Sequence, residues 1–286
     1  MYAVSNGVDT EFFQSRNKEK EKQELHEKYK IPMNRKVVVS AGHLIQRKGI
    51  LDFLKLAKMM PETTFIWFGG GNDSLVTQEV KEAVKKKSEN VIFAGYVEAE
   101  ELRNAYCGAD AFAFFSYEET EGIVVLEALA CEVPVVLRDI PVYKGWIQDQ
   151  MQAYKVHNLE EYKHNLMHIF KEEQEELKGN ARELAEQRSI RSAGERLKVV
   201  YRLSGVNEEE ETEKFIAEME EDIIPIDGLI AFAESDAGAK VFGGPEKAKG
   251  AAEHGREIKA AGAKYCDCPA CAAVEAILSK KGELLG

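Results

Sequence analysis

Short apolar runs alternate with amphipathic segments over the first half of the chain, and this alternation restricts the possible folds more than any other feature. The apolar runs cover residues 37–39, 64–68, 91–94, 111–115 and 133–137. Segments between them, such as 50–60, repeat apolar residues at the spacing of one helix face. A strand without polar alternation is typical of a parallel sheet buried on both faces. The pattern therefore predicts an α/β fold, with a Rossmann-like parallel sheet and helices on both faces.

Glycine-bearing loops follow the predicted strands. Ligands of open parallel sheets bind at the carboxyl ends of the strands, so a ligand site is expected among these loops. The remaining predicted helices of this part span residues 17–29, 76–87, 98–106, 122–130, 159–171, 172–187 and 190–203.

The composition changes near residue 205. Residues 205–286 hold 18 acidic and 9 basic side chains, whereas residues 1–204 hold 32 and 29. We therefore expect two domains, 1–204 and 205–286, of which the second is a small helical segment. Its predicted helices span 208–221, 225–234, 245–261 and 269–281. The acidic run at 208–213 is either a solvated linker or a helix start.

Charge and hydropathy exclude several classes of protein. The net charge of −12 argues against a nucleic-acid partner. No apolar run approaches the roughly 20 residues that a membrane-spanning helix needs. The first residues lack the basic start and apolar stretch of a signal peptide. The five cysteines do not form a disulfide framework, so a cytoplasmic location is expected.

Two glutamates bracket the predicted start of helix 122–130. Glu119 would lie in the loop at the ligand edge, and Glu127 more than one turn into the helix. The backbone N–H groups of Gly122 and Ile123 would be free to bind an anion, aided by the helix dipole. Carboxylates beside such a site suit sugar hydroxyls. The alternative is that both glutamates belong to a solvated helix start, where acidic residues are favoured.

Five segments, in this order along the chain, resemble motifs of the family-four retaining glycosyltransferases of the two-domain B fold. They are residues 5–9 (interdomain linker), 42–49 (diphosphate-binding loop), 93–97 (base-binding loop), 106–110 (the approach to the acidic strand) and 116–130 (the Glu-x7-Glu motif). The resemblance covers residues 4 to about 204. It implies the C-terminal, donor-binding half of such an enzyme, a hexosyltransferase.

Within that family, the chain looks most like bacterial diacylglycerol glucosyltransferases. The segments that carry this likeness are 42–49, 66–69, 117–122 and 138–143. They imply transfer of glucose from UDP-glucose to a lipid hydroxyl such as that of diacylglycerol, with retention of configuration. Such an enzyme would act peripherally at the inner face of the membrane.

The resemblance also implies roles for catalytic residues. Lys48 would neutralise the donor diphosphate, and Glu119 would hold the transferred sugar. His43 stands where the family usually has arginine, and either Arg47 supplies the missing charge or His43 is an ordinary loop histidine. The leaving diphosphate of such enzymes helps to deprotonate the acceptor, so no protein nucleophile, metal or cofactor is expected for the transfer.

Further residues are implied to bind the donor. The backbone at Tyr96 and Val97 would meet the uracil, and Glu127 would accept hydrogen bonds from the ribose. The amides of Gly122 and Ile123 would lie against the sugar or the phosphate.

The chain departs from the family pattern in two places. Residues 138–145 replace a pair of glycines that many relatives carry, which changes the expected shape of the sugar pocket. The chain also begins at the linker, whereas in relatives an acceptor-binding domain precedes the linker. A fragment, a split gene with a separately encoded acceptor domain, or a misplaced start would each give this. The alternative function is therefore a nucleotide-sugar-binding module that is inactive alone.

Three cysteines precede the last predicted helix. Cys266, Cys268 and Cys271 could converge on a zinc ion or an iron–sulfur centre, with His254 or an outside ligand completing the set. The helix dipole would lower the thiol pKa values. The alternative is that reduced cysteines pack a small helical hairpin. A metal- or redox-responsive interaction protein is accordingly a third possible function.

Overall fold

The protein is described by a computed structural model over residues 5–70, 76–204 and 208–285. It divides into two compact units, Met1–Leu197 and Lys198–Gly286. The boundary predicted at residue 205 falls outside the described residues. The boundary between the units falls inside helix α8 (Ile190–Ser204).

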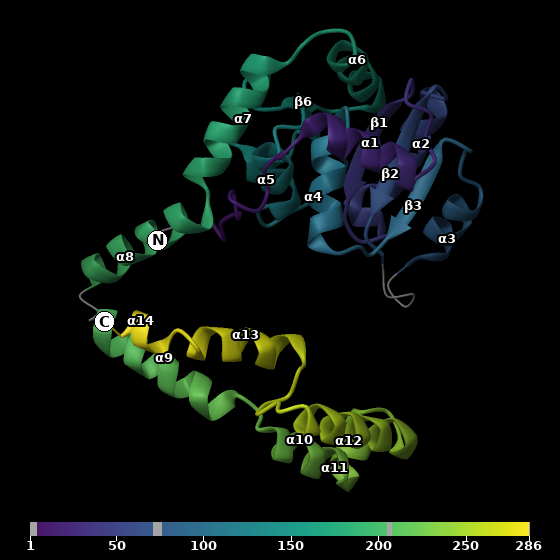
Figure 1. Ribbon diagram of the computed structural model, residues 1–286. Coiled ribbons are helices and arrows are strands. Elements are labelled where there is room, and N and C mark those ends of the chain that lie inside the picture. Colours follow the sequence, from purple (N-terminus) through teal and green to yellow (C-terminus); the bar gives the residue numbers. More distant parts are fainter. Residues whose placement is uncertain (1–4, 71–75, 205–207, 286) are drawn as a thin grey trace. The chain divides into compact units, whose positions relative to one another are not determined.

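The first unit is built on a parallel sheet (Figure 1). The sheet has six strands in the order β3-β2-β1-β4-β5-β6. The strands are β1 (Lys36–Ala41), β2 (Thr63–Phe68), β3 (Val91–Gly95), β4 (Ala111–Phe114), β5 (Val135–Arg138) and β6 (Tyr154–Val156). The predicted α/β fold is confirmed. Strand β6 was not predicted, because it has only three residues and includes a lysine.

Helices cover both faces of the sheet, and successive strand residues alternate between two hydrophobic cores. Val37 and Val39 point into one core, whereas Val38 points into the other, and all three are fully buried. The helices of the first core are α1 (Lys18–Lys28), α4 (Ala99–Gly108), α5 (Ile123–Ala130) and α7 (Glu175–Gln187). Those of the second are α2 (Ile50–Met59), α3 (Gln78–Lys85), α6 (Leu159–Ile169) and the first turn of α7, through Leu177. Burying a side chain as large as valine or phenylalanine stabilises the fold by about 1.5–3 kcal/mol.

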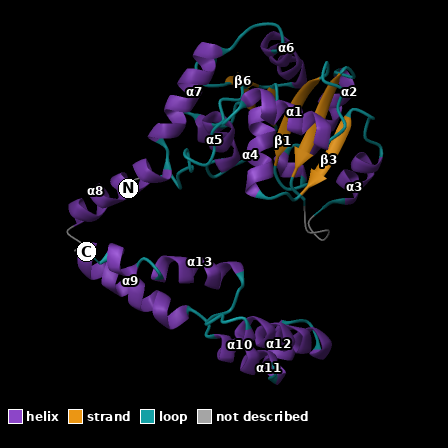
Figure 2. Ribbon diagram, in the orientation of Figure 1, coloured by secondary structure: helices purple, strands orange, loops and turns teal. Residues whose placement is uncertain are grey.

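The second unit is helical (Figure 2). Its helices after α8 are α9 (Glu208–Asp222), α10 (Ile226–Ala233), α11 (Asp236–Val241), α12 (Pro245–Ala260), α13 (Pro269–Leu278) and α14 (Lys281–Leu284). The short helices α11 and α14 were not predicted. Helix α10 packs on α12, where Gly255 allows a close approach, because a Cβ atom there would lie 2.9 Å from Ile230.

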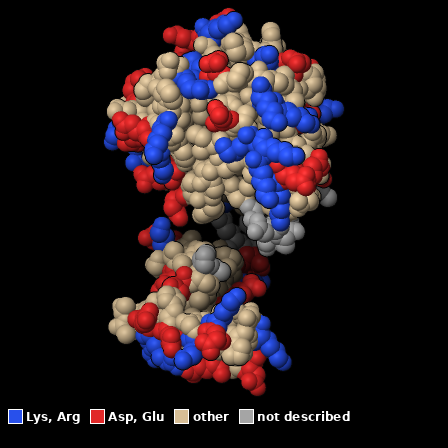
Figure 3. Space-filling model, turned by 90° about the vertical axis from the view of Figure 1, so that its right-hand side faces the viewer, with Lys and Arg blue, Asp and Glu red and all other residues tan. Residues whose placement is uncertain are grey.

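Charge of both signs covers the face of the first unit seen in Figure 3. Lys and Arg side chains gather over part of that face, with Asp and Glu side chains beside them.

Among the described residues, no helix is both long enough and apolar enough to cross a bilayer.

Candidate functional site

The sheet places two loops side by side at the carboxyl ends of its strands. Strands β1 and β4 are neighbours, although β2 and β3 lie between them in the sequence. Strand order therefore reverses between β1 and β4. In open parallel sheets this point opens a crevice for ligands between the two following loops. Here those loops are residues 42–49 and 115–122.

An ion pair joins the two loops. Lys48 Nζ lies 2.5 Å from Glu119 Oε1, and the two side chains are 16% and 7% exposed. Lys48 ends a short 3₁₀ helix, Gln46–Lys48, and Gly49 follows with a left-handed φ of 77°. A Cβ atom at Gly49 would lie 2.2 Å from the Phe115 carbonyl oxygen, so only glycine allows the loops to approach so closely.

Hydrogen bonds fix the same two loops around the pair. The Tyr117 amide donates to the Arg47 carbonyl at 2.9 Å, and Arg47 Nη1 donates to the Glu118 carbonyl at 2.7 Å. Arg47 thus holds the loop that carries Glu119. Beneath them, Asp52 accepts hydrogen bonds of 2.6 Å from both the Tyr117 hydroxyl and the Arg138 guanidinium.

Helix α5 begins beside this pair. Gly122 has a φ of 81°, and Ile123 opens the helix. The Val125 amide donates to the Gly122 carbonyl at 2.8 Å, whereas the amides of Gly122 and Ile123 stand at the helix start, where no preceding turn offers them a carbonyl. The hydroxyl of Tyr143 lies beneath Gly122, 2.7 Å from where a Cβ atom would stand. Tyr143 is fully buried, and its hydroxyl has no hydrogen-bond partner among the described residues. Burial, and next the charge of Glu119, raise its pKa, so the hydroxyl keeps its proton.

Tyr143 was not anticipated as a site residue. It belongs to the segment 138–145, which departs from the family pattern. Residues 138–143 also carry the likeness to diacylglycerol glucosyltransferases. Neither that likeness nor the order of residues shows that the Tyr143 hydroxyl lies beneath the start of α5.

Glu127 lies on α5, one turn and a half beyond Gly122. The Tyr106 hydroxyl donates to Glu127 Oε2 at 3.3 Å. Burial raises the pKa of Glu127 from its ordinary 4.5 to about 7, and the hydrogen bond from Tyr106 only partly offsets the rise. At neutral pH the carboxyl group is therefore balanced between its two protonation states.

Glu127→Gln is expected to stabilise the fold at high pH and to have little effect at low pH. The folded carboxyl keeps its proton up to pH about 7, whereas the unfolded one loses it near 4.5, so wild-type stability falls between these values. One pKa unit corresponds to about 1.4 kcal/mol, so the gain at about pH 8 can reach about 3 kcal/mol. Urea unfolding of both proteins from about pH 4 to 8 measures the difference. A difference that does not change with pH would contradict the assignment.

The other predicted residues lie on neighbouring loops of the same edge. Exposed His43 follows β1, and its Nδ1 lies 3.1 Å from the Gly70 carbonyl oxygen. A carbonyl only accepts, so Nδ1 carries the hydrogen and Nε2 points elsewhere. Tyr96, 83% exposed, and half-buried Val97 follow β3 at the sheet edge. Gly71, the third glycine of the loop after β2, lies outside the described residues.

Glu121, in the same loop as Glu119, binds the N-terminal segment. Its carboxylate accepts from the Ser5 hydroxyl, and from the Asn6 backbone and side-chain nitrogens at 3.0 Å each. Arg188 Nη1 lies 3.6 Å from the same carboxylate. The sequence predicted a linker at residues 5–9 but not this contact, which joins the linker to the loop of Glu119.

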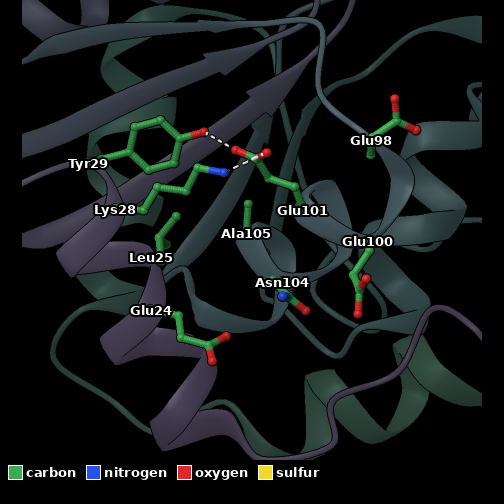
Figure 4. A pocket seen from close by; sticks show the side chains of 9 residues that line it. All are labelled: Glu24, Leu25, Lys28, Tyr29, Glu98, Glu100, Glu101, Asn104 and Ala105. Atoms are coloured by element: carbon green, nitrogen blue, oxygen red, sulfur yellow. Dashed lines mark hydrogen bonds and ion pairs between the residues drawn. The ribbon is translucent and has the colours of Figure 1, made fainter.

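A separate cavity of about 330 Å³ lies between α1 and α4 (Figure 4). Its Glu101 carboxylate already binds Lys28 Nζ and the Tyr29 hydroxyl, each at 2.7 Å. Three further glutamates line it. A diphosphate would be repelled there, so this cavity is not the donor site. Its lining residues are Glu24, Leu25, Lys28, Tyr29, Glu98, Glu100, Glu101, Asn104 and Ala105.

The three cysteines of the second unit come together. Their sulfur atoms all lie within 4.8 Å of one another, and none of the chain's five cysteines forms a disulfide. The expectation of a lowered thiol pKa is wrong for Cys266, because burial raises its pKa to about 11. His254 does not join the cluster, and its Nε2 lies 2.7 Å from Asp267 Oδ2 instead.

Two comparisons match the first unit in sequence. The family model "Glycosyl transferases group 1" matches residues 21–188. The processive diacylglycerol alpha-glucosyltransferase of Acholeplasma laidlawii is 41% identical over 199 residues, which are 70% of this chain and 59% of that protein. The alpha-galactosylglucosyldiacylglycerol synthase of Streptococcus pneumoniae is 39% identical over 123 residues, 42% of this chain and 33% of that one. The chain thus spans less than two thirds of either relative.

Solved structures match the fold. HepE of Anabaena, crystallised with UDP and glucose, aligns with a TM-score of 0.63 at 19% identity, over 72% of this chain and 57% of that one. The C-terminal domain of LpcC, a group 1 family protein from Francisella tularensis, aligns with a TM-score of 0.53 at 22% identity. That alignment covers 63% of this chain and 97% of the domain. At these identities the likeness shows the fold alone.

Proposed function

Because the chain belongs to the group 1 glycosyl transferases, we propose that its first unit binds UDP-glucose and forms the donor half of a retaining glucosyltransferase. The observation that carries this proposal is the pairing of Lys48 with Glu119 at the start of α5. A cation, a carboxylate and free helix amides stand together where the strand order reverses. The cation and the helix amides suit a diphosphate, and the carboxylate suits sugar hydroxyls.

Each donor group has a partner in this arrangement. The diphosphate would take Lys48 and the amides of Gly122 and Ile123, with His43 Nε2 beside it. Glucose hydroxyls would donate to Glu119, whose loop Arg47 holds in place.

The nucleoside would bind further along the same edge. Ribose hydroxyls would donate to Glu127, which favours its charged form, so UDP affinity would rise as the pH passes about 7. The uracil would bind at the backbone of exposed Tyr96 and half-buried Val97.

The reaction assigned to this site is a substitution at the anomeric carbon of glucose. The bond to the diphosphate oxygen breaks, and a bond to the acceptor oxygen forms on the same face. The acceptor proton passes to the leaving diphosphate, and UDP is released. The chain's own residues then bind and orient the donor and stabilise the charge that develops on UDP.

The acceptor proposed is a lipid hydroxyl, that of diacylglycerol. The support is the name of the relative from Acholeplasma laidlawii, 41% identical over 199 residues. Such an acceptor places the reaction at a membrane surface, with the chain bound peripherally at its inner face.

We propose in addition that transfer requires an acceptor-binding domain that joins this chain as a partner. The support is that the first unit matches a C-terminal domain over 97% of that domain's length, and that the chain spans 59% of the length of the relative from Acholeplasma laidlawii. Without the partner, the unit would bind a nucleotide sugar but not transfer it.

Binding and turnover of the purified chain test this proposal. UDP and UDP-glucose are expected to bind, and to raise the free energy of unfolding by about 2.7 kcal/mol at a hundredfold excess over the dissociation constant. No glucosylation of diacylglycerol vesicles is expected from the chain alone. Calorimetric titration, with ADP as the control for the base, measures binding. Equal affinity for ADP and UDP would contradict the uracil site, and turnover near 1 per second or faster would exclude the need for a partner.

The second unit favours a separate, second function. Its three clustered thiols support a metal centre, of zinc or of iron and sulfur, rather than a role in glycosyl transfer.

A further inference from the structure

The thiol cluster of the second unit has nearly the dimensions of a metal site. The sulfur atoms of Cys266, Cys268 and Cys271 lie within 4.8 Å of one another. Zinc–sulfur bonds are about 2.3 Å long, so two thiolates on a tetrahedral zinc ion lie about 3.8 Å apart. The sulfurs therefore need to approach by about 1 Å at most to reach the spacing of a zinc site.

The backbone holds these cysteines in position. The Cys266 amide donates to the Ile224 carbonyl at 3.0 Å, and the Ile226 amide donates to the Lys264 carbonyl at 2.9 Å. These bonds join the α9–α10 connection to the segment before α13. Cys268 caps α13, and its amide lies 3.4 Å from Cys266 Sγ, as a donor that would stabilise a thiolate.

The surroundings close one side of the cluster and leave the other open. Cys266 and Cys271 are 7% and 5% exposed and pack with Ile223, whereas Cys268 is half-buried. Among the described residues, no fourth histidine, cysteine, aspartate or glutamate joins the group, since His254 is bound to Asp267.

Small domains with little buried apolar surface are commonly stabilised by a structural metal. An ion here would join the segment before α13 to the first turn of that helix. The same segment packs on Ile223 and bonds to the Ile224 carbonyl, so the ion would fix a part of the chain that already contacts the end of α9.

We propose that Cys266, Cys268 and Cys271 bind one Zn²⁺ ion as three thiolates, with a fourth position open to water or to an outside ligand. Each thiol releases its proton to solvent as its sulfur–zinc bond forms, and no oxidation is involved. The ion closes the turn between residue 266 and the first turn of α13, and so orders the entry to that helix.

The test uses the full chain, purified anaerobically with reductant, stripped with a chelator and titrated with ZnCl₂ against a chromophoric chelator. One equivalent is expected to bind. Serine at any one of the three cysteines should weaken binding at least about a hundredfold, because a tetrahedral thiolate site loses a ligand. The matched control His254→Gln should bind as the wild type does. Titration with Co²⁺ should give the absorption of a tetrahedral site and a thiolate charge-transfer band.

Zinc should also protect the chain around residues 264–271 from proteolysis in the wild type, a measurement that needs no variant. Binding below about 0.1 equivalent would overturn the proposal, since thiolate sites hold zinc too tightly for such a low occupancy. A weakening by His254→Gln as large as that of the serine variants would overturn the ligand set. Iron and sulfide in the anaerobically purified chain, with the visible absorption of a cluster, would overturn the assignment to zinc.

Discussion

Lys48→Met is expected to weaken UDP binding by about tenfold to a hundredfold, because hydrogen bonds to charged groups contribute about 1.5–3 kcal/mol. Lys48 is only 16% exposed, so solvent screens its charge little. The loss should therefore change only modestly with salt, and should be somewhat larger at low salt. Calorimetric titration at two salt concentrations measures both effects. Lys58→Met, at an exposed position on α2, is the matched control and should bind UDP normally.

Removing Lys48 also leaves Glu119 without its ion-pair partner. The carboxylate side chain is 7% exposed, so the variant should lose about 1–3 kcal/mol of folding free energy. Urea unfolding without ligand measures this loss separately from binding. UDP affinity that equals that of the control in a folded Lys48→Met protein would show that the diphosphate binds elsewhere.

Hydrophobic patterning was sufficient to predict the sheet. Runs such as 111–115 have no polar alternation, which indicates strands that are buried on both faces. The segments between successive runs are long enough to form the helices that connect parallel strands. The pattern failed at β6 (Tyr154–Val156), where three residues with a central lysine carry too little periodicity.

The site could be predicted only as separate segments. Lys48 and Glu119 are 71 residues apart, and their contact depends on β1 lying beside β4, which residue order does not reveal. The resemblance to a family placed both residues at the donor. It could not place Tyr143, because that residue stands where the chain departs from the family, and its burial depends on the packing beneath α5.

The cysteines show the same limit. Spacings of two and three residues allow Cys266, Cys268 and Cys271 to meet, and local geometry brings them together. The side chain of His254 comes from another helix, and there a charged neighbour, Asp267, binds it instead. Contacts within one segment were predictable, whereas contacts between segments required the structure.

Glu119→Gln is expected to tighten the binding of UDP while removing most of the preference for UDP-glucose. Without ligand, Lys48 and Glu119 neutralise each other at 2.5 Å, so an incoming diphosphate must compete with Glu119 for the lysine. Glutamine removes that competition and also the repulsion between the carboxylate and the diphosphate. Both effects favour UDP binding. If together they contribute about 1 kcal/mol to the binding free energy, UDP binds roughly fivefold more tightly.

UDP-glucose gains less from the same change, because its sugar hydroxyls lose a charged acceptor. The ratio of UDP-glucose to UDP affinity should therefore fall by about tenfold or more. Titration of the wild type, both single variants and Lys48→Met/Glu119→Gln with both ligands completes a double-mutant cycle. The tightening of UDP binding should shrink in the Lys48→Met background, since no lysine remains to be released and only the repulsion is relieved. Weaker UDP binding by Glu119→Gln alone would show that Glu119 supports the diphosphate site instead of competing with it.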